Sequence, residues 1–293
     1  MFVSEALAVG AAICIALSGM LISELRGRVD IVRLARWQML AASAMTGALS
    51  LILGGWRTLG PAQIGLLAAS SLFGIVMAST TYFAAIYKAG PRNTALLFSL
   101  TSPFALALGY GVLGETNSRQ QGLGILLVLV GIVLAIGLPG REARLSPVTR
   151  VPWTGIALGI ITAFGQAMGS LLARPAMAAG VEPFTAMAVR SGLAAAVFLG
   201  LLVLPIAALN RPYRFAYGEM GIGVASAFLG TGLGMSLLMA ALAGGNVGIV
   251  STLSSMTPVV ILPMVWIRSG VRPPFMAWIG AALAVAGTAL ISL

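Results

Sequence analysis

The sequence predicts an all-α membrane protein of ten transmembrane helices, arranged as two inverted five-helix repeats. Hydrophobic residues make up 59% of the 293 residues and charged residues only 8%, whereas a soluble domain carries about 25% charged residues. Ten apolar segments of membrane-spanning length can be marked, and none shows the period-two alternation of a transmembrane β-barrel strand. Similar motifs also recur about half a chain apart, which is the mark of an internal repeat.

The ten segments are separated by short connections rich in glycine and proline, the residues that mark turns. They cover residues 4–23, 32–54, 62–87, 93–113, 120–138, 153–173, 183–205, 217–242, 246–267 and 273–292. The longest connection separates the fifth segment from the sixth. We therefore divide the chain into a first repeat (1–140), a basic linker (141–152) and a second repeat (153–293). Because five is odd, the second repeat enters the membrane in the opposite direction.

The correspondence between the halves rests on pairs of like residues at nearly constant spacing. The pairs are Ser102-Pro103 and Thr257-Pro258, Phe73 and Phe228, Arg36 and Arg190, Gly124 and Gly280, and Gly131 and Gly287, at offsets of 154 to 156 residues. Four further glycines in the sixth segment, Gly155, Gly159, Gly165 and Gly169, form two pairs of small residues four apart. Such pairs are typical of close helix packing in membranes.

Charge indicates the orientation. The net charge is +10, and the basic residues lie in short connections, which fits the anionic cytoplasmic leaflet of a membrane rather than nucleic acid. Thirteen of the 17 Lys and Arg residues lie in or beside the connections that follow the odd-numbered segments. By the positive-inside rule these connections are cytoplasmic and both termini are not. The expected location is the bacterial inner membrane.

The chain lacks the chemical groups on which several classes of protein depend for their function. There is no histidine and a single cysteine, Cys14, so the common catalytic sets and metal clusters are missing. We expect no enzyme activity, no metal and no cofactor. No carboxylate lies deep in an apolar segment, and a charge at the membrane centre costs roughly 2.5–3.5 kcal/mol on insertion scales. Proton antiport through a buried acid is therefore disfavoured.

Polar but uncharged residues are the candidates for a substrate site. They lie within apolar segments of both halves, and the candidate binding residues are Tyr82, Asn93, Ser99, Thr101, Gln166, Arg190, Ser254 and Met256, with Phe98 as an apolar wall. Pro103 and Pro258 have no N–H, so the carbonyls of Ser99 and Ser254 lose their helical partners at predicted kinks. Alternatively, hydroxyl groups satisfy these carbonyls and the small residues only pack helices.

Arg190 has two interpretations as well. It lies inside the seventh segment, where it can pair with an anionic group of a ligand. Alternatively, its side chain extends to the membrane surface and keeps its charge in water.

The chain resembles the EamA-like ten-helix exporters of the drug/metabolite transporter superfamily. The residues that carry the resemblance are Ser102-Pro103, Gly114-Glu115, Gly124 and Gly131 in the first half, and Thr257-Pro258, Gly280 and Gly287 in the second. The resemblance implies a cavity lined chiefly by the third, fourth, eighth and ninth helices. It also implies export of amino acids or other small metabolites. Members often keep their termini in the cytoplasm, whereas the count of basic residues here places them outside.

We therefore expect a secondary transporter that exports small metabolites, amino acids first, by alternating access around a central polar cavity. The alternatives are a transporter of drugs or lipid-linked metabolites and a membrane scaffold that transports nothing. The expected partners are a small-molecule substrate and membrane lipid, with no nucleic acid, and the chain is expected to work as a monomer.

Overall fold

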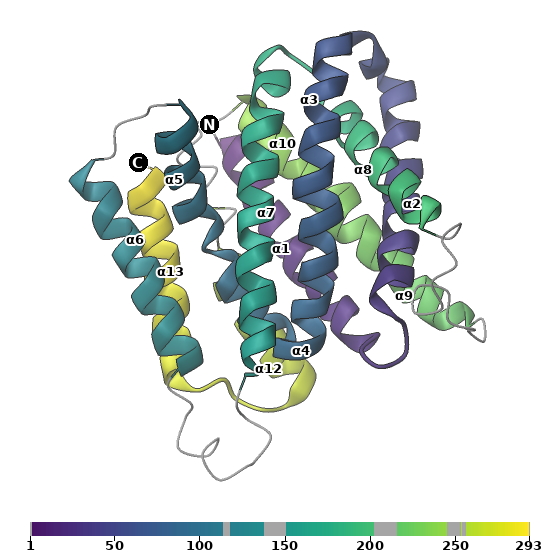
Figure 1. Cartoon of the computed structure of the whole chain (residues 1–293). Helices are drawn as coiled ribbons and strands as arrows, with labels where there is room; N and C mark the ends of the chain where they lie inside the picture. Colours follow the sequence, from purple (N-terminus) through teal and green to yellow (C-terminus); the bar gives the residue numbers. More distant parts are fainter. Residues whose placement is uncertain are drawn as a thin grey trace.

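The computed structural model describes residues 2–113, 118–137, 151–201, 216–244, 253 and 256–292. All regular structure in this part of the chain is helical, and both termini lie at the same end of the bundle (Figure 1). That placement agrees with an even number of membrane crossings.

The helices of the first half follow the five predicted segments. They are α1 (Phe2–Glu24), α2 (Ile31–Leu53), α3 (Pro61–Ser71), the wide π-helical segment η2 (Leu72–Met77), α4 (Ala78–Phe98), α5 (Thr101–Leu113), α6 (Arg119–Ile132) and the π-helical segment η3 (Val133–Gly137), with a short 3₁₀ turn η1 (Gly55–Thr58).

The second half repeats this organisation. Its helices are α7 (Trp153–Ala178), α8 (Pro183–Gly200), α9 (Tyr217–Ala227), the π-helical segment η5 (Phe228–Gly234), α10 (Met235–Gly244), α12 (Thr257–Ser269) and α13 (Phe275–Ser292). The third segment is thus α3, η2 and α4 as far as Ala89, and its counterpart in the second half, the eighth segment, is α9–η5–α10. Most of the linker and the first part of the ninth segment, including Ser254, lie outside the described residues.

The boundary between the third and fourth segments differs from the prediction. Gly90 has φ 81° and ψ 163°, a conformation that only glycine adopts without strain, and Pro91 follows it. The third segment therefore continues to Ala89, and the fourth begins at Pro91 rather than at residue 93. The end of the sixth segment was also placed too early, because α7 continues through Pro175 to Ala178.

The two predicted proline kinks have different structures from those expected. In the fourth segment the helix is interrupted between the end of α4 at Phe98 and the start of α5 at Thr101. There the carbonyl of Ser99 accepts a hydrogen bond from the N–H of Ser102 at 3.4 Å, so it is not left free as we predicted. Pro258 stands in the first turn of α12, where a missing N–H costs little because that turn has no helical partner for it.

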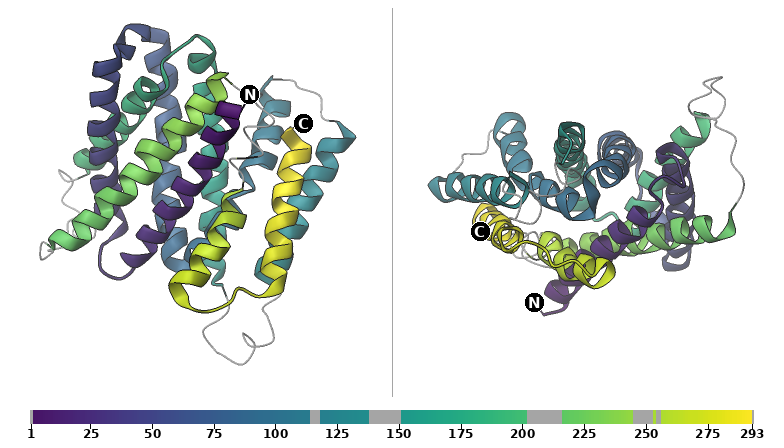
Figure 2. Two further views of the ribbon diagram at one scale, coloured as in Figure 1. Left: turned by 180° about the vertical axis from the view of Figure 1, so that it is seen from behind. Right: turned by 90° about the horizontal axis from the view of Figure 1, so that it is seen from below.

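The contact between α6 and α13 shows directly that the repeats are inverted. These helices lie side by side at one side of the bundle (Figures 1 and 2). A Cβ on Gly124 would lie 2.6 Å from the carbonyl oxygen of Gly287, and a Cβ on Gly131 would lie 2.5 Å from that of Gly280. The first glycine of one helix thus meets the second glycine of the other, as two antiparallel helices related by a two-fold axis require.

Other contacts obey the same correspondence. α4 packs along α7, and α1 packs along α9, η5 and α10, so the third and sixth segments are paired in the same way as the eighth and first. Ser71 Oγ donates to the carbonyl of Arg190 at 2.6 Å, and its counterpart Ser226 Oγ accepts from Gln38 Nε2 at 2.6 Å. Each bond joins the third segment of one half to the second segment of the other.

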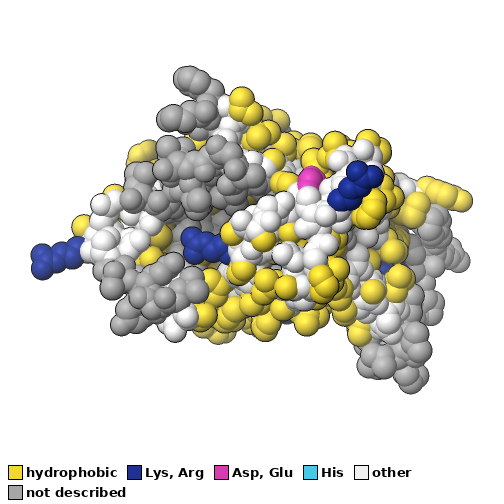
Figure 3. Space-filling model, turned by 90° about the horizontal axis from the view of Figure 1, so that it is seen from above, with side chains coloured by type: hydrophobic (Ala, Val, Ile, Leu, Met, Phe, Trp, Pro, Cys, Tyr) yellow, Lys and Arg dark blue, Asp and Glu magenta, His cyan; other side chains and the backbone are white. Residues whose placement is uncertain are grey.

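The outer surface fits a lipid environment. Five helical stretches are long and apolar enough to cross a membrane, namely Ala6–Glu24, Pro61–Phe98, Trp153–Ala178, Pro183–Gly200 and Tyr217–Leu238, and three shorter apolar helices accompany them. Large apolar side chains such as Ile52, Leu123 and Ile267 are exposed. Seen from the end that holds the termini, hydrophobic side chains lie along much of the outline that the described residues form, and few charged ones are visible among them (Figure 3).

The close contact of α6 with α13 predicts a sharp difference between two glycines of one helix. Gly131→Leu forces a side chain into the backbone of α13 and should destabilise the fold by roughly 1–3 kcal/mol, the usual cost of overpacking. Gly122→Leu is the control, because nothing lies within 4 Å of a Cβ there. Thermal unfolding in detergent should show a lowered midpoint for Gly131→Leu alone. Equal midpoints would mean that this contact does not hold the helices together.

Candidate functional site

A cavity lies about halfway along the bundle, between helices of both repeats. Its wall includes residues of α1, α2, η2, α4, α7, α8, η5, α10 and α12, and it holds about 750 Å³ of empty space, part of it open to the surroundings. No charged side chain occurs among the described residues that line it.

Two wide helical turns at equivalent positions shape this cavity. η2 contributes Gly74 and Ile75 to the wall, and η5 contributes Gly230 and Thr231. π-helical turns are rare and are often found at functional sites, because the extra residue changes which side chains face inward. These turns were not predicted from the sequence, although the pair Phe73 and Phe228 marked the equivalent positions.

Four polar groups face the cavity without a hydrogen-bond partner in the described part of the protein. They are the hydroxyls of Ser79, Tyr82 and Thr231 and the side-chain amide of Gln166. An unsatisfied polar group in a membrane interior costs several kcal/mol. These groups therefore need water or a ligand in the cavity.

The other polar side chains of the wall are held by protein. Gln38 Nε2 donates to Ser226 Oγ at 2.6 Å, and Ser18 Oγ donates to the carbonyl of Ser226 at 2.8 Å. The hydroxyl of Thr162 donates to the carbonyl of Leu158 at 2.8 Å and lies 2.8 Å from Oγ1 of Thr81. These bonds fix α1, α2 and α9 together on one side of the cavity and α4 against α7 on the other.

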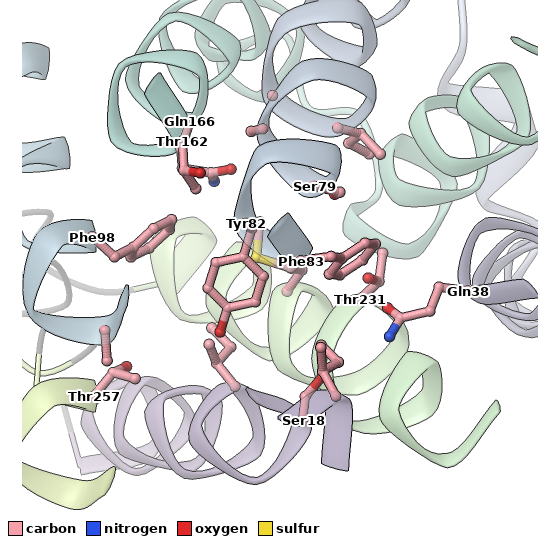
Figure 4. Close-up of a pocket in the computed structure, with 18 of the residues that line it drawn as sticks. Ser18, Gln38, Ser79, Tyr82, Phe83, Phe98, Thr162, Gln166, Thr231 and Thr257 are labelled. Carbon is pink, nitrogen blue, oxygen red and sulfur yellow. The ribbon is translucent and has the colours of Figure 1, made fainter. Parts of the chain in front are cut away.

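Aromatic rings form the apolar part of the wall. The Tyr82 ring meets Phe83 edge to face at 6.1 Å between centroids and Phe98 at 6.2 Å. Figure 4 shows Tyr82 between these two rings, with Gln166 and Thr162 on one side and Ser18 on the other. The hydroxyl of Tyr82 reaches α1 at Gly19, where a Cβ would lie 3.0 Å from it.

Among the residues predicted for the site, Tyr82 and Gln166 line this cavity together with Phe98. Asn93, Ser99, Thr101 and Met256 are not part of its wall, and Ser254 lies outside the described residues.

The predicted residues away from the wall have other surroundings. Asn93 Nδ2 donates to the carbonyl of Ala89 at 2.8 Å, and Thr101 Oγ1 donates to that of Phe98 at 2.7 Å, which is the local bonding considered as the alternative. Ser99 is buried, and its hydroxyl has no hydrogen-bond partner among the described residues. Met256 stands at the start of α12, directly before Thr257, which does line the cavity.

Arg190 is buried in α8 rather than extended to the membrane surface, with 1% of its surface exposed. Its Nη1 lies 3.6 Å from Sδ of Met187, a residue of the cavity wall. The alternative that its charge reaches water is therefore wrong for this conformation.

The four glycines of α7 pack closely against neighbouring helices, as predicted. Gly155 meets Ala89, Gly159 meets Leu97, Gly165 meets Met77 and the carbonyl of Phe73, and Gly169 meets Gly74. These contacts bring Thr162 and Gln166 of α7 to the cavity.

Sequence reasoning missed Ser18, Gln38, Ser79, Thr162 and Thr231 as site residues. The available signal was a polar residue surrounded by apolar ones near the middle of a segment. Ser79 and Thr162 carry that signal. Thr231 lies in a glycine-rich stretch that is typical of helix packing, so it was not recognised as a site residue.

Comparison with known proteins agrees with this architecture. No curated protein matches the chain. A crystal structure, described only as that of a protein, matches with a TM-score of 0.68 and 20% identity over 96% of this chain and 94% of that chain. The model of the EamA-like transporter family matches residues 3–137 and again residues 153–293. Because these two matches cover nearly the whole chain, one in each half, the protein belongs to the EamA-like transporter family.

Proposed function

We propose that this transporter exports small amphipathic metabolites, amino acids first, by alternating access around the cavity. The observation that carries the proposal is the set of four unpartnered polar groups, Ser79, Tyr82, Gln166 and Thr231, facing a space near the middle of the bundle. A bundle that only spans the membrane has no use for such groups.

The composition of the wall supports an amphipathic solute. Hydroxyl and amide groups can donate to and accept from the polar end of an amino acid, while the rings of Tyr82, Phe83 and Phe98 can cover its side chain. A second candidate is an uncharged aromatic drug, which the same three rings favour. Any solute in this space contacts both repeats.

The symmetry of the scaffold supports alternating access. The third segment packs on the sixth as the eighth packs on the first, so the two repeats can exchange conformations and open the same cavity to opposite sides. With the basic connections in the cytoplasm and both termini outside, the inner membrane of a bacterium is the proposed location.

The cavity predicts that one bulky side chain on its wall blocks flux. Ser79→Leu, on α4, should lower transport of labelled amino acids into proteoliposomes at least about tenfold, because it fills space that the solute needs. Thr80→Leu, at the next position of the same helix, is the matched control. The hydroxyl of Thr80 donates to the carbonyl of Val76, and Thr80 does not line the cavity.

Equal flux in the two variants, both shown to be folded, would place the pathway elsewhere. Absence of flux in the wild type for every amino acid and drug offered would favour the scaffold.

The absence of acids among the described lining residues predicts weak coupling to protons. Exchange of labelled for unlabelled amino acid should change less than about twofold when the pH gradient is collapsed, because no Asp, Glu or His is among the described lining residues. Counterflow in proteoliposomes with and without a protonophore measures this. A steep dependence on the gradient would contradict it and would direct attention to Glu182 and to Glu115, which lies outside the described residues.

A further inference from the structure

Arg190 is a fully buried cation with no counter-ion among the described residues. It lies seven residues after the start of α8, about 10 Å along the helix at 1.5 Å per residue. Its Nε and Nη2 atoms are buried and have no hydrogen-bond partner within the described residues, and Nη1 has only the sulfur of Met187.

Nearby polar groups do not neutralise this charge. Ser71 Oγ and Ser191 Oγ donate to the backbone carbonyls of Arg190 and Met187, each at 2.6 Å. Glu182, the acid at the start of the same helix, accepts from the N–H groups of Phe184 and Thr185 at 2.9 and 2.7 Å. It lies eight residues, or about 12 Å, from Arg190 along the helix axis.

The guanidinium lies directly behind the cavity wall. Two residues beside it, Gly74 and Met187, line the cavity. A Cβ on Gly74 would lie 2.7 Å from Nη2, so the missing side chain of this glycine leaves the room that the guanidinium occupies. A single layer of residues, in the wide turn η2 and in α8, separates the charge from the cavity.

The open edge of Arg190 has the geometry that carboxylates use. Nε and Nη2 lie on the same side of the planar guanidinium, and their N–H groups can make two parallel hydrogen bonds to one carboxylate. A buried unpaired charge is strongly unfavourable. An anion that supplies the partner therefore stabilises the conformation in which α8 and η2 admit it, as a population shift requires.

We propose that Arg190 binds the carboxylate of the transported solute, and that the substrate class is small organic acids with an apolar side group. The inference rests on the proposed transport function. The described cavity wall offers no acid to an ammonium group, so the carboxylate is required and the amino group is not. Amino acids and the corresponding 2-oxo acids are then alternative substrates, whereas the decarboxylated amines and the amides are not.

The test compares four probes that share one side chain. L-leucine and 4-methyl-2-oxopentanoate carry the carboxylate, whereas L-leucinamide and 3-methylbutylamine do not, and the phenylalanine series repeats the comparison. Binding to the purified full chain in detergent is measured by titrating the shift of the thermal unfolding midpoint. Sodium chloride at equal concentration shows the effect of a simple anion.

Wild-type protein should bind the carboxylates at least about tenfold more tightly than the amides and amines, the scale of a charge-assisted hydrogen bond. Arg190→Gln should remove this preference. Arg190→Lys, which keeps the positive charge, should retain part of it. Arg36→Gln is the matched control. Arg36 is the counterpart of Arg190 in the first half, but its Nε donates to the carbonyl of Phe198 at 3.3 Å, and Phe198 does not line the cavity. This variant should leave the preference unchanged.

Three results would overturn the proposal. One is wild-type protein that binds no carboxylate in the millimolar range more tightly than its amide and amine. Another is chloride stabilising as well as the carboxylates do. The third is an unchanged preference in Arg190→Gln, or in Arg190→Lys if the first variant does not fold. Carboxylate binding that depends on Arg190 without flux would instead refute the transport function alone.

Discussion

The backbone contact between Gly74 and Gly169 determines where the other parts of the cavity lie. A Cβ on Gly74 would come within 3.0 Å of the Cα of Gly169, so only two glycines let η2 and α7 approach this closely. Ser70 Oγ secures the approach by donating to the carbonyl of Gly169 at 2.6 Å. With α7 held here, Gln166 and Thr162 face Tyr82 across the cavity, and the space beside Gly74 admits the guanidinium of Arg190.

The scaffold is symmetric, whereas the cavity wall is not. Glycine pairs and interhelical hydrogen bonds repeat across the two-fold axis, but at an offset of 155 residues Ser79 corresponds to Gly234 and Tyr82 to Leu237. At these two positions the third segment supplies hydroxyls and an aromatic ring, whereas the eighth supplies small and apolar groups. In the proposed mechanism, symmetry serves the exchange between conformations, and the asymmetric wall would give a bound solute one preferred orientation.

The sequence was sufficient to predict the ten segments, the inverted repeat and the glycine contacts. Segment length and repeated small residues have direct structural consequences in a bilayer. The sequence was not sufficient for the π-helical turns or for the continuation of α7 through Pro175, which depend on the packing of neighbouring helices. Phe98 and Ser99 show the main limit of prediction from the sequence: both were predicted to line the site, but only Phe98 does. Lipid and protein interior are both apolar, so no hydrophobic pattern indicates which side of a helix faces inward. Of the eight predicted binding residues, Tyr82 and Gln166 line the cavity, and Arg190 lies just behind its wall.

The central claim, that one midplane cavity opens to both sides of the membrane, is tested most directly by the reactivity of a cysteine on its wall. Cys14 is the chain's only cysteine, so Cys14→Ser gives a background in which Ser79→Cys carries the single thiol. A membrane-impermeant maleimide should label this thiol both in spheroplasts and in inverted membrane vesicles. Labelling from one side only would contradict alternating access, and labelling from neither side, with full labelling after denaturation, would contradict the cavity itself.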